Sequence, residues 1–566
     1  MIFRLRSIEI TICVITFIFF ACAKEGFPPG GPEDRTPPEV VGTIPAPGAT
    51  FVDPYTTVQV WFSEGIKRSS ASDAIFITPF PGDEVEYQWR GNRVKIQFLE
   101  PLKSDVTYVI TLGTGIRDYR NNALKSSFTL AFSTGAVLDE GEIAGRVYGV
   151  GDGRGIGVWA YSIEESLDVD PSRREPDYIV QCGAGGEFGF FHVSPGLYRL
   201  FAVRDGASDR LYQAGEDEVG VTFRDVLLSR DEMLRADSLY FRMAKEDTSA
   251  PSLIRAVSLD RRHLTLRFDE SLSSQRIVAF DSFAIVSAED SLDTLSVLDG
   301  YLDLLNAQVV HILTQDQETG KRYRIIVSGL MDEAGNLVDA EYDEAQFEGI
   351  GEPDTTSPKL IQTVPRPGQR GVVLDGMVRL IFDEVLDTTR FREGFSLTDS
   401  LDTPVKGGFR WKGPSEVLFS ASARLASRSI YEVTIPGKTA VDLAGNSLAD
   451  TTFWFQTLDR DTLSEISGRV TDPDSRAGGN IYVIIRQLEN SDVSYTQWIS
   501  GSGNYRIPDI LPGRYLLECF RDWDGNGEYS FGKVFPYQPA ERFVVYQDTI
   551  GVRSRWPNEG NDLRLP

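Results

Sequence analysis

The chain has 566 residues, 41% hydrophobic and 11% aromatic, a composition that excludes wholesale disorder and allows several domains of roughly 100–150 residues each. Its formal net charge is −26, so the phosphate backbone of a nucleic acid would be repelled, and we expect no nucleic-acid partner. The 52 glycines and 29 prolines supply many turn signals, which favours β-rich architecture.

Residues 1–21 have the features of a secretory signal peptide. Arg4 and Arg6 precede an apolar stretch at 10–20, which is shorter than the ~20 residues that span a bilayer. The stretch ends in Phe-Phe-Ala-Cys at 19–22, which resembles a bacterial lipobox. The resemblance implies a lipid on Cys22, and Lys24-Glu25 is similar to the tether of Bacteroidetes-type surface lipoproteins. A plain cleaved signal or membrane anchor is the alternative.

This resemblance implies an outer membrane lipoprotein that contacts the membrane through its lipid and is exposed at the cell surface. A periplasm-facing protein is the alternative. Residues 22–36 are rich in Pro and Gly, which cannot hold a helix, so we expect a lipidated stalk there.

Two motifs recur three times along the chain and define a module that we call type A. The first motif follows an alternating apolar run and reads Phe62-Ser63-Glu64, Phe268-Asp269-Glu270 and Phe382-Asp383-Glu384. The second motif has the form Asp-x-x-Gly-Asn and begins at Asp118, Asp332 and Asp442, with Asn121 in place of the glycine in the first copy. The first and third copies also share a Pro-rich opening at a constant offset of 320 residues, as in Thr36 and Thr356. Such long repeats predict an array that presents surfaces rather than one reaction centre.

A second unit, type B, occurs twice and is marked by Gly-Arg-Val at 145–147 and 468–470, followed by a Pro-Gly turn. Short apolar segments separated by turn signals predict two-sheet sandwiches in both types. The predicted fold is therefore all-β, with five tandem modules in the order A-B-A-A-B. Their predicted bounds are 37–135 (A1), 141–245 (B1), 247–348 (A2, which has lost the Pro-rich opening), 356–457 (A3) and 464–566 (B2).

Type A resembles the S-layer-type (SbsA-like) bacterial Ig-like domain, on the strength of its opening and its two motifs. Type B resembles the carboxypeptidase regulatory-like, transthyretin-like β-sandwich, through Gly-Arg-Val and Pro-Gly-x-Tyr. Both resemblances imply a β-sandwich in an envelope setting, and neither family has a uniform ligand.

The recurrent acids are candidates either for catalysis or for structure. Because each acid pair returns once per module with its own turn, we expect a structural role, in which the acid accepts backbone N–H bonds and Gly or Asn takes the left-handed conformation. The residues expected to build these turns are Asp118, Asp332, Asp442, Asn336 and Asn446.

A metal site is predicted most directly at 522–528. Asp522, Asp524, Asn526 and Glu528 place oxygen donors at alternate positions around Gly527, like the first half of a calcium loop. The bidentate glutamate of an EF-hand is missing, since Lys533 stands at the twelfth position. Calcium is therefore the one cofactor predicted, and a plain Asx-type turn is the alternative.

The remaining chemistry-bearing residues favour no reaction. The histidines, His192, His263 and His311, are assigned one to a module, which argues against a zinc site and against the copper site of the similar copper-resistance sandwiches. Cys182 and Cys519 are expected to be buried as small apolar groups. Six tryptophans are expected mostly in sandwich cores, with stacking on sugar rings as the alternative: Trp61, Trp89, Trp411, Trp498, Trp523 and Trp556.

The sequence therefore predicts a non-enzymatic envelope lipoprotein that displays its modules for spacing, adhesion or interaction. The partner is a protein or a polysaccharide that the sequence does not name. The alternatives are a carbohydrate-binding accessory protein, a degenerate hydrolase, or a periplasmic assembly factor.

Overall fold

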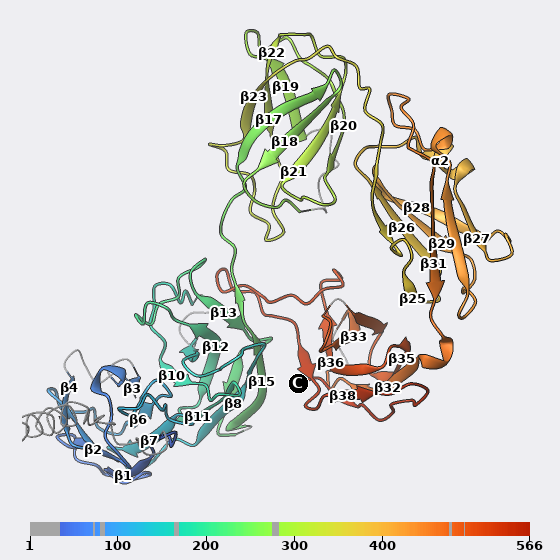
Figure 1. Ribbon diagram of the computed structural model, residues 1–566. Helices are drawn as coiled ribbons and strands as arrows, with labels where there is room; N and C mark the ends of the chain where they lie inside the picture. Colours follow the sequence, from blue (N-terminus) through green and yellow to red (C-terminus); the bar gives the residue numbers. More distant parts are fainter. Residues whose placement is uncertain are drawn as a thin grey trace, which may run out of the picture. The chain divides into compact units, whose positions relative to one another are not determined.

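The computed structural model describes residues 34–71, 74–79, 85–163, 169–231, 233–273, 282–474, 478–491 and 493–566. The predicted signal peptide, Cys22 and most of the predicted stalk lie outside these residues. The described residues divide into two compact units, one up to Leu138 and one from Asp139 to Pro566. Strands dominate both units, which confirms the predicted all-β fold (Figure 1). Among the described residues, no helix combines the length and apolar character needed to cross a membrane.

The first unit contains A1, a sandwich of two sheets ordered β1-β2-β5-β4 and β3-β6-β7. In β2 every second side chain is buried, because successive strand residues point to opposite faces. The core collects these side chains with those of β6 and β7. The elements are β1 (Val40–Ile44), β2 (Thr57–Phe62), η1 (Arg68–Ser70), β3 (Ile75–Thr78), β4 (Val85–Arg90), β5 (Arg93–Phe98), β6 (Thr107–Leu112) and β7 (Phe128–Ser133).

A2 repeats this arrangement in the second unit, with sheets β17-β18-β21-β20 and β19-β22-β23. Its strands are β17 (Leu253–Asp260), β18 (His263–Phe268), β19 (Phe283–Ser287), β20 (Val297–Leu302), β21 (Val309–Thr314), β22 (Arg322–Val327) and β23 (Glu344–Glu348).

A3 has sheets β24-β26-β29-β28 and β25-β31-β30-β27. Its elements, with the 3-10 turn that follows, are β24 (Leu360–Val364), β25 (Arg370–Val372), β26 (Met377–Phe382), α2 (Thr388–Gly394), β27 (Ser396–Asp399), β28 (Gly407–Gly413), β29 (Glu416–Ala421), β30 (Ile430–Ile435), η3 (Gly437–Thr439), β31 (Thr451–Thr457) and η4 (Arg460–Thr462). The helix α2 is not predicted by the repeat pattern. Asp387 caps it by accepting from the N–H groups of Thr389 and Arg390, and Phe391 anchors it in the core.

The two B modules share a different topology. In each, a longer sheet (β10-β9-β12-β13-β16 with β14, and β34-β33-β36-β37 with β38) accompanies a three-stranded sheet (β11-β8-β15, and β35-β32-β39). In B1 the strands are β8 (Gly141–Tyr148), β9 (Gly157–Ser162), β10 (Tyr178–Gln181), β11 (Glu187–Val193), β12 (Gly196–Arg204), β13 (Glu218–Val221), β14 (Val226–Leu228), β15 (Arg235–Arg242) and β16 (Ala244–Lys245). In B2 they are β32 (Ser464–Thr471), β33 (Asn480–Gln487), β34 (Ser494–Ile499), β35 (Gly503–Ile510), β36 (Gly513–Asp522), β37 (Phe543–Val545), β38 (Ile550–Val552) and β39 (Leu563–Arg564).

The glycine of each Gly-Arg-Val motif is required by close packing of the backbone. A Cβ on Gly145 would lie 1.9 Å from the carbonyl oxygen of Leu239, and one on Gly468 would lie 2.2 Å from that of Asn561. Both carbonyls belong to the segment that lies alongside β8 or β32 in parallel orientation. The repeated glycine therefore marks where the last strand of each B module closes on the first.

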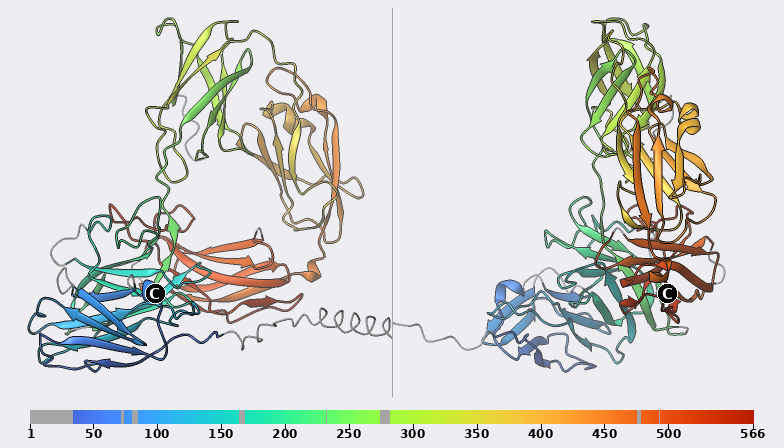
Figure 2. Two further views of the ribbon diagram at one scale, coloured as in Figure 1. Left: turned by 60° about the vertical axis from the view of Figure 1, so that its left-hand side comes forward. Right: turned by 45° about the vertical axis from the view of Figure 1, so that its right-hand side comes forward.

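Each module is filled by a hydrophobic cluster of its own, and among the described residues a further small cluster of Leu374, Leu458 and Leu463, with Leu511 against it, lies where A3 meets B2. Figure 2 shows the separate sandwiches from two further sides. Cys182 and Cys519 lie in the clusters of B1 and B2 and form no disulfide, and burial raises the pKa of the Cys182 thiol to about 12. Both cysteines are therefore apolar core residues, as the sequence predicts.

The expected burial of the tryptophans is wrong for half of them. Trp498, Trp523 and Trp556 are 59%, 55% and 73% exposed, since they lie on an edge strand or in loops rather than on inward strand positions. Trp89 and Trp411 do pack against the cores of A1 and A3.

Candidate metal centres

The same three carboxylates meet in every A module. In A3 they are Asp354 from the segment before the first strand, Glu384 from the end of β26, and Asp442 from the Asp-x-x-Gly-Asn turn, with ligand oxygens within 4.8 Å of one another. The equivalent groups are Asp34, Glu64 and Asp118 in A1, and Asp247, Glu270 and Asp332 in A2. We call each group a triad. Three carboxylates at this spacing provide oxygen ligands of the kind that calcium prefers.

The turn aspartate is held in place by its own turn. Asp442 is 5% exposed and accepts from the backbone N–H of Asn446 at 2.8 Å and from its side-chain amide at 2.9 Å. Asp332 and Asp118 make the same two bonds to Asn336 and Asn122. Gly335 and Gly445 have φ of +93° and +95°, and Asn121 has φ of +68° at the same position in A1. The turn thus presents one buried carboxylate at a fixed position.

The asparagine of the turn also reaches the segment that enters the module. Its side-chain amide donates to the backbone carbonyl of the entry aspartate at 3.1 Å in A1, 2.9 Å in A2 and 3.3 Å in A3. The entry aspartate, in turn, accepts from the backbone N–H two residues later, at Thr36, Ser249 and Thr356. Each triad therefore fastens the chain that enters a module to the body of that module.

The middle residue of the Phe-x-Glu motif has a separate role. Asp383 accepts from the backbone N–H of Lys359 at 2.6 Å, and Asp269 accepts from that of Ser252 at 2.7 Å. In A1 the hydroxyl of Ser63 accepts from Glu39 at 3.0 Å. This residue pins the first strand, whereas the glutamate beside it belongs to the triad.

The glutamate of each triad has a raised pKa. Burial, together with Asp354, Asp383 and Asp442, raises the pKa of Glu384 to about 8. Burial and the neighbouring acids also raise the pKa of Glu64 and of Glu270. Like charges this close disfavour full ionisation unless protons or a cation compensate them.

A fourth acidic cluster lies in the predicted calcium loop of B2, with a changed membership. It consists of Asp522, Asp524 and Glu541, within 4.8 Å, whereas Glu528 is exposed and lies outside it. Asn526 donates its amide to Asp524 at 3.1 Å. Asp522 accepts from the N–H groups of Gly525 and Gly527, and Glu541 accepts from those of Trp523 and Ser530. Burial raises the pKa of Glu541 to about 7.

The sequence predicts part of these centres and misses the rest. The turn acids and Asp522 and Asp524 are found in clusters, but the entry acids and Glu541 are not predicted. The entry acids carried a signal, because Asp34 and Asp354 stand at the same 320-residue offset as the Pro-rich opening. Glu541 carried none, since it reaches the loop only through the tertiary fold.

The assignment of one histidine to each module is wrong. His263 on β18 and His311 on β21 both lie in A2, with Nε2 of His263 2.8 Å from Nδ1 of His311. Nε2 of His311 lies 3.2 Å from Asp303, and its ring stacks on Tyr301 with centroids 4.8 Å apart. Burial lowers the pKa of His263 to about 4 and also lowers that of His311. The pair is a buried hydrogen-bonded chain of neutral rings.

The family described as bacterial Ig-like domain matches residues 34–134 and 354–457, which correspond to A1 and A3. The chain therefore contains bacterial Ig-like domains. No curated protein matches the chain.

Several solved structures resemble parts of the chain. The N-terminal part of the bacterial S-layer protein SbsC is 12% identical and covers 37% of this chain and 44% of its own, with a TM-score of 0.17. Domains 1–6 of SbsC are 10% identical over 92% of this chain and 67% of their own, also with a TM-score of 0.17. CopC from Methylosinus trichosporium is 18% identical over 18% of this chain and 94% of its own, with a TM-score of 0.16. The chain thus spans less than half of the first of these structures.

Proposed function

We propose that the protein is a non-enzymatic lipoprotein of the cell envelope, anchored through Cys22, that spaces and presents Ig-like and regulatory-like sandwiches. The observation that carries the proposal is the array itself. Each module closes its own hydrophobic core, and the acids that recur in the A modules fasten module entries rather than converge on one reaction centre. Such an array functions by binding a partner and by holding its modules at a distance from the membrane.

Calcium is the cofactor that we propose for this array. The triads and the cluster around Asp522 offer oxygen ligands only, which suits a hard cation. A cation shared by the entry aspartate and the body of a module would stiffen the joint before it, so the spacing between modules would depend on calcium.

The location is tested by protease shaving of intact cells that express the chain with its own signal. The proposal expects metabolic labelling of Cys22 with a fatty acid and digestion of the modules from outside. The Cys22→Ala variant should lose both the label and the membrane association. Modules that stay protected until the outer membrane is opened would place the protein on the periplasmic side.

Calcium binding is tested by melting the mature chain in calcium and in EDTA. We expect calcium to raise the melting temperature of the A modules, because a ligand that binds only the folded state stabilises it. Glu384→Gln should remove the calcium-dependent shift of A3, and Asp524→Asn that of B2. Glu432→Gln, an exposed acid on β30, is the matched control and should keep the wild-type response. A melt that EDTA does not change would dismiss calcium at all four clusters.

The competing function is that of a carbohydrate-binding accessory protein or degenerate hydrolase of the envelope, and the exposure of Trp498, Trp523 and Trp556 favours its binding form. A screen with chromogenic glycosides separates the two. Turnover that an acidic-residue substitution abolishes would contradict the non-enzymatic proposal.

A further inference from the structure

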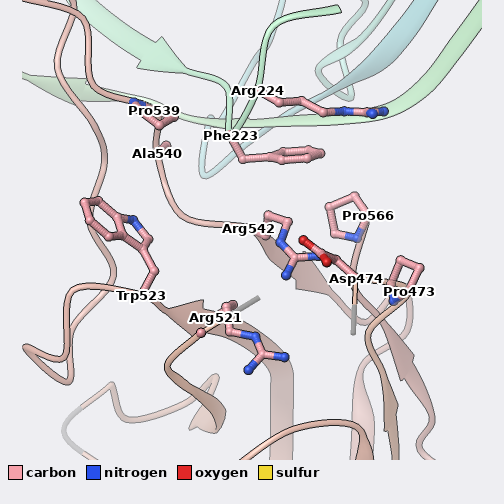
Figure 3. Close-up of a pocket in the computed structure, with 11 residues that line it drawn as sticks. Phe223, Arg224, Pro473, Asp474, Arg521, Trp523, Pro539, Ala540, Arg542 and Pro566 are labelled. Carbon is pink, nitrogen blue, oxygen red and sulfur yellow. The ribbon is translucent and has the colours of Figure 1, made fainter. Parts of the chain in front are cut away.

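A cavity of about 720 Å³ opens beside the acidic loop of B2 and lies within the size range of small-molecule sites. Most of its lining comes from B2, and the loop at Phe223 and Arg224 of B1 covers one side (Figure 3). The backbone N–H of Ala540 donates to the carbonyl of Thr222 at 3.1 Å, which joins the two walls.

The walls of the cavity are flat and apolar. Figure 3 shows the rings of Phe223 and Trp523 on different sides of it, with Pro473 and Pro566 at one end. Trp523 stands between Asp522 and Asp524 in the chain and is 55% exposed, and its backbone N–H donates to Glu541 at 2.7 Å. Exposed aromatic and proline faces suit the apolar C–H face of a sugar ring.

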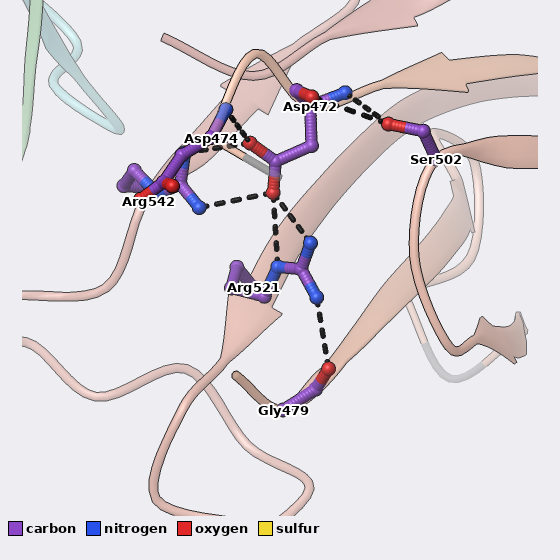
Figure 4. Close-up of polar contacts among 6 residues, drawn as sticks. All are labelled: Asp472, Asp474, Gly479, Ser502, Arg521 and Arg542. Carbon is purple, nitrogen blue, oxygen red and sulfur yellow. Dashed lines mark hydrogen bonds and ion pairs between the residues drawn. The ribbon is translucent and has the colours of Figure 1, made fainter. Parts of the chain in front are cut away.

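One end of the cavity rests on a rigid base of paired arginine and aspartate side chains. Asp472, whose side chain is 1% exposed, is bound by Arg521 at 2.6 Å and by Arg542 at 2.7 Å (Figure 4). Burial acts to raise the pKa of Asp472, but the bonds from Arg542 and Arg521 outweigh it and lower that pKa. Both arginines line the cavity, and so do Arg224 and Asp474, so three guanidinium groups stand against the two carboxylates of Asp472 and Asp474 and one positive charge remains. Arg521 is further fixed by the carbonyl of Gly479 at 2.8 Å.

The charge of the whole molecule limits the ligand further. At −26 the chain repels a polyanion, as it repels nucleic acid, but a single carboxylate next to fixed guanidinium groups is attracted locally. A saccharide that carries one isolated carboxylate therefore matches the cavity better than either a neutral sugar or a polyanionic chain.

We propose that this cavity binds a uronic-acid-containing saccharide, whose sugar ring stacks on Trp523 while its carboxylate faces Arg542. This binding site adds to the proposed spacing function, because it gives B2 a ligand of its own.

The test uses the mature chain and cellobiouronic acid, with binding measured by isothermal titration and by the line widths of ligand protons in NMR. Cellobiose is the matched neutral probe, since it differs only in having a hydroxymethyl group in place of the carboxylate. We expect saturable binding of cellobiouronic acid and about tenfold weaker binding of cellobiose. Added salt should lower the affinity for cellobiouronic acid, because it screens the charges.

The variant Trp523→Ala should weaken binding about tenfold, since it removes the stacking surface. Its matched control is Trp498→Ala, a similarly exposed tryptophan on β34 outside the cavity, which should bind like the wild type. An unchanged melting temperature of both variants shows that folding is not the cause. Arg224→Gln, an exposed cavity residue, should reduce binding of the acid more than binding of cellobiose.

Three outcomes would overturn the proposal: no saturable binding of cellobiouronic acid, equal loss in Trp498→Ala and Trp523→Ala, or equal binding of acetyl-glutamate, which carries carboxylates without a sugar ring. None of these outcomes would contradict the proposed spacing function, because that function depends on the modules and their anchor and not on this cavity.

Discussion

Gly335 and Gly445 adopt a left-handed backbone with φ near +95° in the turns that hold Asp332 and Asp442. A side chain at this conformation is strained wherever it points, and only Asn and Asp tolerate it moderately well. Asn121 in A1 therefore replaces glycine without a change in the turn. The recurrence of glycine at this position therefore reflects the backbone conformation of the turn rather than a role in ligand binding or catalysis.

The predicted effect of this conformation is measurable by urea unfolding. Gly445→Ala should destabilise A3 by about 1 kcal/mol, whereas Asn121→Gly should leave A1 nearly unchanged. Gly413→Ala is the control within A3, because it has an ordinary φ and open space around its Cβ. An equal effect of Gly445→Ala and Gly413→Ala would show that the turn is not strained.

At the scale of the element, paired strands bring together residues that lie far apart in the sequence. The pairing of β18 with β21 places His263 opposite Leu313, and so diagonally beside His311, 48 positions away, inside A2. Asp260 and Asp303 are the acids next to the two rings, at 3.9 and 3.2 Å. Neither acid offsets the effect of burial, so the pKa of both imidazole rings stays below its usual value.

This pair predicts how the stability of A2 depends on pH. Burial lowers the pKa of His263 to about 4 in the folded chain, against 6.5 for a solvent-exposed imidazole, so protonation favours the unfolded state. Stability should be full above pH ~6.5 and should fall as the pH drops toward ~4, by about 2–3 kcal/mol at most. Urea midpoints of A2 between pH 4.5 and 7 measure the change. The double variant His263→Gln/His311→Gln should flatten the profile, and His192→Gln in B1 should not.

At the scale of the whole molecule, B2 contacts B1 within the second unit although 218 residues (246–463) separate the end of B1 from the start of B2. Arg242 on β15 pairs with Glu518 on β36 and lies 4.6 Å from the ring of Tyr529 and 4.4 Å from that of Phe543. Arg199 lies 3.6 Å from the ring of Tyr537. Guanidinium groups stacked on rings provide the main charged contacts here.

The contact predicts that Arg242→Ala will loosen B2 from B1. Both partners of the ion pair are largely buried, at 17% and 11% exposure, but Glu518 keeps its second partner Arg486, so the loss should cost about 1.5–3 kcal/mol. Faster proteolysis of the 527–541 loop is the measurement. Arg235→Ala on the same strand is the control, because its pair with Glu142 is exposed and should cost less than ~1 kcal/mol. Equal resistance of the Arg242→Ala and Arg235→Ala variants to the protease would contradict the role of Arg242 in this contact.

The sequence by itself determined the all-β class, the repeated sandwiches and the turn acids. Alternating apolar residues, Pro-Gly turns and left-handed glycines each depend on only a few neighbouring residues. The sequence alone therefore predicts them. Only the tertiary structure decided which acids meet, that His263 touches His311, and that Trp523 lines a cavity above Arg521 and Arg542. These groups come from strands and loops whose spacing along the chain carries no signal, and the pairing of sheets alone brings them together.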